Sequence, residues 1–120
     1  MSSQFQTGQV LFADQTTKIR VVKIPITFTT GVITRDFLQE LGMQMVRLEI
    51  NNRDALADVL VRTEPFQEPP ERIPPNTRGE LTDEVHSFLQ ITPNAVSGIG
   101  DAFAYVAPTA ELVRMGLIAS

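Results

Sequence analysis

The feature that most constrains the fold is an alternation of apolar and polar side chains at every second residue. In VKIPITFT, which begins at Val22, the apolar side chains all fall on one face of an extended strand. Pro25 lacks a backbone N–H, so this strand is predicted to lie at a sheet edge or to have one side without a partner. Ile19 and Val21, just upstream, have the opposite parity, which predicts a β-bulge near Val21 and Val22.

The same alternation recurs in several later segments. MVRLEI and ADVLVRT are separated by the polar turn NNRDA, and together they predict a β-hairpin. Further strands are predicted in QVLFAD, RGELTDEV, SFLQIT and AFAYVA, and in the last of these Phe103 and Tyr105 are expected to pack in the core. These six or seven short strands, separated by turn residues, predict a mainly β fold: a single antiparallel β-sandwich or an open barrel.

Two segments depart from this period and predict short helices. TRDFLQELG has helical spacing over residues 34–41, with Thr34 as the expected N-cap and Gly42 in the left-handed conformation at its end. PTAELVRMG predicts a second helix, capped by Thr109 and closed by Gly116. Helices this short are not stable alone, so both are expected to cover the ends of the sandwich.

Composition sets the size and class of the protein. The chain has 120 residues, 42% of them hydrophobic, so we expect residues 1–120 to form a single β domain with its own core. The formal net charge of −4 argues against a nucleic-acid partner. The sequence contains no cysteine, which excludes disulfides and thiolate metal sites. MSSQFQTGQ lacks the features of a signal peptide, and no apolar run approaches the ~20 residues of a membrane span, so we expect a soluble protein without a membrane partner.

The segment PFQEPPERIPPNT, residues 65–77, contains five of the chain's eight prolines. A linker would need a self-sufficient core on each side, and neither flanking part holds enough strands for one. A ligand for SH3-type domains needs prolines three residues apart, and that spacing does not occur here. We therefore predict a stiff loop over residues 64–77.

The sequence alone leaves two placements of this loop open. It either folds back onto its own sheet or docks on a neighbouring subunit, and proline lowers the entropy lost in both cases. Phe66 and Ile73 are its expected apolar anchors. The candidate partner interface is formed by Phe66, Pro69, Pro70, Ile73 and Pro74.

The residues that most often carry chemistry favour structural roles in this chain. His86 is the single histidine, so it cannot build a His-rich zinc site, and no nucleophile motif accompanies it. SGIGD precedes a strand rather than a helix, which favours a tight turn with positive φ over a phosphate-binding loop. Glu80, Asp83 and Glu84 fit a solvated acidic turn better than a calcium loop. We predict no catalytic residue, cofactor or metal. Glycoside hydrolysis by a pair of carboxylates that the fold brings together remains an open alternative.

Residues 44–107 resemble small β-sandwich structural proteins of bacteriophage virions, of the capsid-decorating or head-accessory type. The resemblance rests on LEINN with the strand ADVLVRT after it, on IPPNTRGEL, and on FLQITPNAVSGIGDAFAYVA. It implies that the last of these segments is a sandwich hairpin. It also implies a non-enzymatic structural or assembly protein that acts through protein–protein contacts, in a virion assembled in the host cytoplasm.

The partners implied by this resemblance are further copies of the chain, in a homo-oligomer, and other virion proteins. The polar N-terminal arm, residues 1–9, and the proline-rich loop are the segments by which such subunits would clasp one another. The alternative is a small ligand-binding β-domain, with a pocket at one end of the sandwich that is lined by residues from the strand ends.

Overall fold

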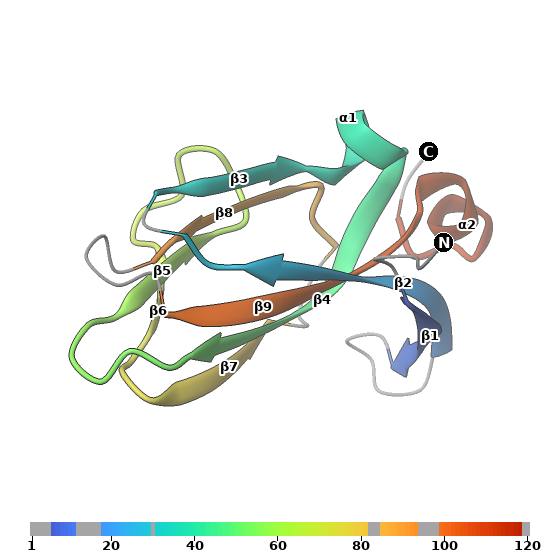
Figure 1. Cartoon of the computed structure of the whole chain (residues 1–120). Helices are drawn as coiled ribbons and strands as arrows, with labels where there is room; N and C mark the ends of the chain where they lie inside the picture. Colours follow the sequence, from blue (N-terminus) through green and yellow to red (C-terminus); the bar gives the residue numbers. More distant parts are fainter. Residues whose placement is uncertain (1–5, 12–17, 30, 82–84, 94–98, 119–120) are drawn as a thin grey trace.

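The computed structural model describes residues 6–11, 18–29, 31–81, 85–93 and 99–118. In these residues nine strands form two antiparallel sheets that pack face to face (Figure 1). Sheet A has the strand order β1 (Gln6–Leu11), β2 (Lys18–Thr27), β9 (Gly100–Pro108), β4 (Met43–Asn52) and β7 (Thr77–Leu81). Sheet B has the order β3 (Ile33–Asp36), β8 (Phe88–Thr92), β5 (Val59–Arg62) and β6 (Glu71–Ile73).

The predicted mainly β, antiparallel sandwich is confirmed, and the barrel alternative is wrong because the two sheets stay separate. The predicted number of strands is also wrong. β3 occupies residues that the sequence predicts as the start of the helix over 34–41, and β6 is a three-residue strand inside the proline-rich segment. Of the predicted N-terminal arm, residues 6–9 belong to β1, and residues 1–5 lie outside the described ranges.

The chain changes sheet at six of the eight connections between consecutive described strands, and only β1–β2 and β5–β6 are hairpins. The hairpin predicted from MVRLEI and ADVLVRT is therefore wrong, because β4 belongs to sheet A and β5 to sheet B. The hairpin implied for the last two strands is wrong for the same reason, since β8 and β9 lie in different sheets.

A buried polar corner carries the chain from β4 to β5. The Asn52 side chain is fully buried, and its Nδ2 donates hydrogen bonds to the carbonyl oxygens of Ala57, Ile73 and Pro74 at 2.9, 2.9 and 3.0 Å. Its Oδ1 accepts from the backbone N–H of Asp54 at 3.1 Å, and the Asp54 carboxylate accepts from the N–H of Ala57 at 3.0 Å. One amide thus ties the β4–β5 connection to the end of β6.

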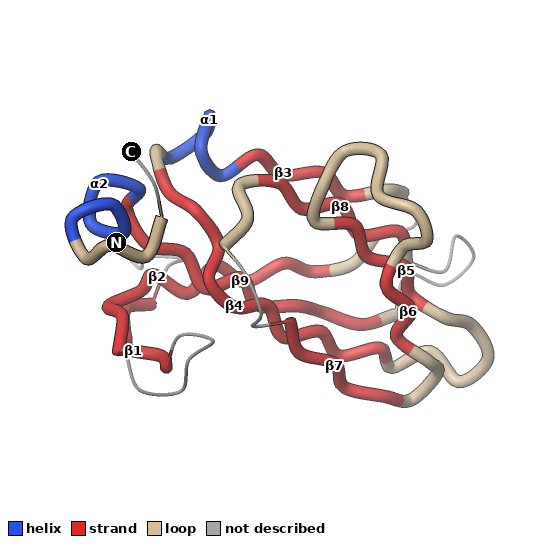
Figure 2. Tube along the Cα trace, turned by 180° about the vertical axis from the view of Figure 1, so that it is seen from behind, coloured by secondary structure: helices blue, strands red, loops and turns tan. Residues whose placement is uncertain are grey.

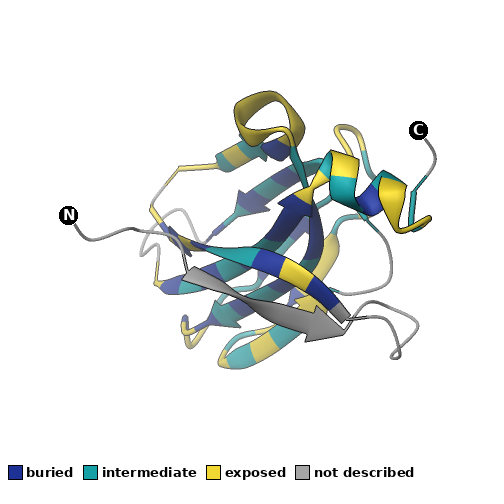
Figure 3. Ribbon diagram, turned by 90° about the vertical axis from the view of Figure 1, so that its right-hand side faces the viewer, coloured by how far each residue is buried: buried dark blue, intermediate teal, exposed yellow. Residues whose placement is uncertain are grey.

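Two apolar cores explain the parity change in β2. Ile24, Ile26 and Phe28 face the main core between the sheets, whereas Ile19 and Val21 face a second core on the outer side of sheet A. β2 keeps a continuous register with both β1 and β9, so the bulge predicted there is wrong; the register shift of sheet A lies in β4, at Met45/Arg47. Figure 3 shows buried and exposed positions alternating along the strands.

Pro25 lies, as the sequence predicts, in a part of β2 that has a described partner strand on only one side. It pairs with Phe103 of β9, while β1 pairs only with residues 18–23 of β2. No described strand therefore needs an N–H from position 25.

The first helix is shorter than predicted. α1 (Phe37–Leu41) begins after Asp36, whose carboxylate accepts from the N–H of Gln39 at 3.0 Å, so Thr34 is not the cap and lies in β3. Gly42 has φ 67°, as predicted.

The second helix, α2 (Thr109–Arg114), covers the outer face of sheet A at one end through its buried Leu112 (Figure 2). Its N-cap is Pro108 rather than Thr109, and Gly116 follows with φ 76°. Within the described residues, no helix combines the length and the apolar character that crossing a membrane requires.

Candidate functional site

The outer face of sheet A, beyond the part covered by α2, presents a grid of polar and aromatic side chains. Its residues come from the four neighbouring strands β2, β9, β4 and β7. On each of these strands, every second side chain points away from the main core. The cross-strand rows are Lys23–Tyr105–Arg47, then Pro25–Phe103–Glu49–Glu80, then Thr27–Asp101–Asn51–Arg78. We call these residues the outer grid.

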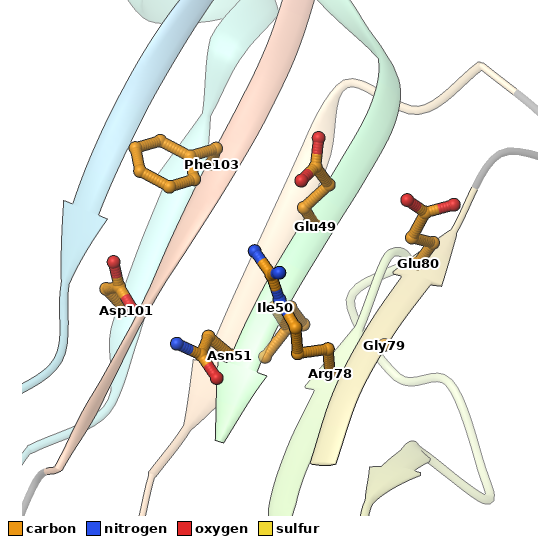
Figure 4. A pocket seen from close by; sticks show the side chains of 8 residues that line it. All are labelled: Glu49, Ile50, Asn51, Arg78, Gly79, Glu80, Asp101 and Phe103. Atoms are coloured by element: carbon orange, nitrogen blue, oxygen red, sulfur yellow. The ribbon is translucent and has the colours of Figure 1, made fainter. Parts of the chain in front are cut away.

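The second and third rows of the outer grid line a depression of about 290 Å³. Figure 4 shows Glu49, Glu80, Asp101 and Phe103 around it, with the Arg78 side chain reaching across toward β4. Three carboxylates, those of Glu49, Glu80 and Asp101, and one cation, Arg78, therefore line this depression.

Two carboxylates lie directly opposite each other in this grid, and Arg47 holds them together. Glu49 pairs with Glu80 across β4 and β7, an arrangement that like charges disfavour. The Arg47 Nη2 lies 2.6 Å from Glu80 Oε1 and 3.5 Å from Glu49 Oε1. The Tyr105 hydroxyl also donates to Glu49 Oε1, at 2.5 Å. The single positive charge of Arg47 thus offsets one of the two negative charges of this pair.

The environment of the grid shifts two ionisations. Burial, followed by the hydrogen bond to the Glu49 carboxylate, raises the pKa of Tyr105 to about 12. Burial by itself would lower the pKa of Arg47, but the hydrogen bond to Glu80 and the nearby carboxylates raise it above its ordinary value. Tyr105 therefore stays a neutral donor to Glu49, and Arg47 stays a cation beside both carboxylates.

Phe103 and Tyr105 lie on the outer side of sheet A, so neither packs in the main core between the sheets as predicted; Tyr105 packs against the second core instead. Both side chains are half-buried, and Lys23 Nζ lies 4.2 Å from the centre of the Phe103 ring. The residues of β9 that face the main core are instead Ala102, Ala104 and Val106. Each alanine lies between larger residues on both neighbouring strands: Ile24 and Leu48 for Ala104, Ile26 and Ile50 for Ala102.

A second hollow, of about 340 Å³, lies beside the proline-rich segment. Met45 and Leu81 supply apolar walls, and Thr63, Gln67 and His86 supply polar groups. His86 is positioned by its backbone, which exchanges hydrogen bonds with Met45 at 2.7 and 3.0 Å.

The predicted interface residues are divided between surface and core. Phe66 is 97% exposed, and Pro69 and Pro74 are exposed as well, whereas Pro70 is half-buried. Ile73 is only 6% exposed and belongs to the main core, because it is the last residue of β6. Residues 64–77 are thus two connections separated by a strand, and the structure does not bring Phe66 and Ile73 together as paired anchors.

Local polar contacts brace the connection that carries Phe66. Arg62 Nε donates to the carbonyl oxygen of Gln67 at 3.1 Å, and Arg62 Nη2 bonds to Glu68 Oε1 at 2.9 Å. The Gln67 side chain in turn accepts from the backbone N–H of Thr63 at 2.8 Å. Phe66 therefore projects from a loop that is ordered by its own neighbours.

The positive φ predicted from SGIGD is confirmed at Gly100, the first residue of β9, which has φ 140°; Ser97 and Gly98 of the predicted turn lie outside the described residues. A Cβ there would lie 2.5 Å from the carbonyl oxygen of Asn51 and 2.8 Å from the Phe28 ring. Glu80 lies in the outer grid, and Asp83 and Glu84 fall outside the described residues. Among the residues that the structure describes, no group of three His, Asp or Glu side chains is arranged to hold a metal ion.

Comparisons with known proteins found no matching family model, no matching curated protein and no matching solved structure. The surfaces of this chain therefore carry the functional interpretation alone. They offer a braced loop with an exposed aromatic ring, a charged flat face, and a hollow with mixed walls.

Proposed function

We propose that the protein is a non-enzymatic structural or assembly subunit that acts through protein–protein contacts. The observation that carries this proposal is Phe66, 97% exposed at the surface of a braced loop. The resemblance of residues 44–107 to virion proteins makes a bacteriophage particle the assembly that we propose. Further copies of the chain and other virion proteins are the proposed partners.

An exposed aromatic ring on an ordered loop suits a protein contact for two reasons. Burying a phenylalanine side chain against a partner contributes roughly 1.5–3 kcal/mol, and aromatic anchors dominate many interfaces. The loop contacts made by Arg62 and Gln67 reduce the entropy that binding would otherwise cost. The ring has no comparable role in the fold of its own chain, because almost none of it is buried.

The test is the molar mass of the protein by light scattering over a concentration series, for the wild type and for Phe66→Ser. We expect the wild type to self-associate and the variant to lose mass at the same concentrations. Leu56→Ser is the matched control, because Leu56 is 91% exposed on a different loop. Ile73→Ser is unsuitable, since it would remove a core side chain. Identical masses for the wild type and Phe66→Ser at every concentration would show that this loop is not an interface for self-association.

A second candidate function follows from the hollow of about 340 Å³ that Met45, Leu81 and His86 line. Its combination of apolar walls with polar and charged groups supports a small-ligand site. Thermal unfolding in the presence of a set of small molecules tests it. Stabilisation that Leu81→Ala weakens would favour this function, and no shift with any compound would count against it.

A further inference from the structure

β7 (Thr77–Leu81) is the edge strand of sheet A next to β4. It forms one border of the molecule in both Figure 1 and Figure 2, where no labelled element lies beyond it. An edge strand presents backbone N–H and C=O groups that can pair with another strand. The identity of that second strand can be argued from the side chains of β7 itself.

The sequence of β7, Thr-Arg-Gly-Glu-Leu, has complementary charges about its central glycine. Arg78 and Glu80 both point to the outer face and are exposed, whereas Gly79 faces the core beneath Ile73. Arg78 forms no ion pair with any residue in the described ranges. If two copies of this strand pair antiparallel with Gly79 opposite Gly79, each Arg78 lies directly opposite the partner's Glu80.

The other edge strands with described side chains lack this property. In β3 the Arg35 guanidinium is bound to Glu40 at 2.9 Å, and Asp36 caps α1. β6 has only three residues, and its Arg72 is bound to Asp58 at 2.9 Å. Of these three edges, β7 alone combines five residues with a free cation and a carboxylate at matching positions.

We propose that two copies of the chain dimerise through β7, antiparallel and about a two-fold axis at Gly79, which joins their A sheets into one continuous sheet. This inference rests on the proposed assembly function and names a second copy of the chain as the partner. The interface is isologous, so each Arg78–Glu80 pair occurs twice. The incoming Arg78 also places a second cation beside Glu80, which faces Glu49 across the strands and is otherwise neutralised by Arg47.

A charge-swap experiment tests this geometry. R78E places glutamate opposite the partner's Glu80, and E80R places arginine opposite the partner's Arg78, so each variant alone sets like charges against each other twice. We expect the dimer dissociation constant, measured by sedimentation, to rise at least about tenfold in each. An equimolar mixture of R78E and E80R has opposite charges at both positions and should form a heterodimer.

The recovery in the mixture separates pairing from a merely structural effect. E80R also removes an ion-pair partner of Arg47, so circular dichroism is used to check that each variant is folded. Amide hydrogen exchange of the wild type gives a measurement without any variant: residues 77–81 should gain protection as concentration rises, and residues 33–36 should not.

Three results would overturn the inference: a wild type that is monomeric at the highest concentration reached, a dimer that neither variant weakens, or protection that appears at β3 instead of β7. The outcomes for Phe66 and for β7 are distinguishable. A dimer that persists in Phe66→Ser but is lost in R78E supports the β7 contact and argues against the Phe66 loop in self-association. The reverse result supports the loop and refutes the β7 contact.

Discussion

Replacing Asn52 by alanine is expected to lower the free energy of unfolding by about 3 kcal/mol. The side chain is fully buried, its Nδ2 contacts three carbonyl oxygens, and its Oδ1 accepts one N–H. An amide nitrogen has two hydrogens, so these contacts correspond to three full hydrogen bonds, each contributing ~1 kcal/mol. A domain of this size has a total stability of roughly 5–15 kcal/mol, so the loss is a large fraction.

Asn52→Asp sharpens the test, because it keeps the shape of the side chain and replaces the NH₂ donor by a carboxyl oxygen. An ionised carboxylate would face the carbonyl oxygens that Asn52 now donates to, whereas the protonated acid keeps one donor. The pKa of this aspartate is therefore raised in the folded protein above its unfolded value of about 3.9. The folded variant then binds more protons than the unfolded one, so its stability relative to the wild type falls as the pH rises from about 4 to 7.

Urea unfolding followed by circular dichroism measures both variants. Asn51→Ala is the control: Asn51 is the neighbouring residue and lies in the outer grid, so a loss below ~0.5 kcal/mol is expected. The reasoning is refuted if Asn52→Ala loses no more than Asn51→Ala. It is also refuted if the deficit of Asn52→Asp is the same at pH 4 and pH 7.

Three further outcomes are expected. Gly100→Ala should destabilise the protein by roughly 2–5 kcal/mol in urea unfolding, because position 100 combines φ 140° with a clash of the new Cβ against backbone. Gly79→Ala should destabilise it less, because only the end of the Ile73 side chain must move. Tyr105 is the single tyrosine, so an absorbance titration should show its phenolate forming near pH 12 rather than 10, and Glu49→Gln should lower this midpoint. Because the pKa is raised in the folded state, folding stability should fall as the pH rises between these two values. A midpoint near 10 in the wild type would contradict this. Leu112→Ala should cost about 2–5 kcal/mol in the same unfolding assay, and a smaller loss would show that α2 does not seal the second core.

The sequence contains enough information for the layered β architecture but not for its pairing. The alternation from Val22 to Phe28 and the positive φ at Gly100 are local properties, and both predictions are confirmed. The predicted hairpin of β4 and β5 fails because turn residues such as those in NNRDA suit both a hairpin within one sheet and a connection that crosses to the other sheet. What sends the chain across to the other sheet is Asn52, whose hydrogen bonds reach Ile73 and Pro74, more than twenty residues away.

The outer grid was predictable only in part. The alternation in MVRLEI already places Arg47 and Glu49 on a polar face. In AFAYVA both parities are apolar, so hydrophobicity alone puts the larger side chains, Phe103 and Tyr105, in the core. The structure turns the alanines inward because the strands on both sides of β9 supply large residues at the same level. That choice depends on neighbours distant in sequence.

The central position of β9 also has a consequence for biosynthesis. β9 pairs with both β2 and β4, and it is synthesised after every other described strand. Until residues 100–108 have left the ribosome, β2 and β4 each expose an edge that can only be closed by a segment not yet made. Sheet A is therefore completed only after its other four strands have been synthesised, and the nascent chain passes through a stage in which these open edges favour aggregation.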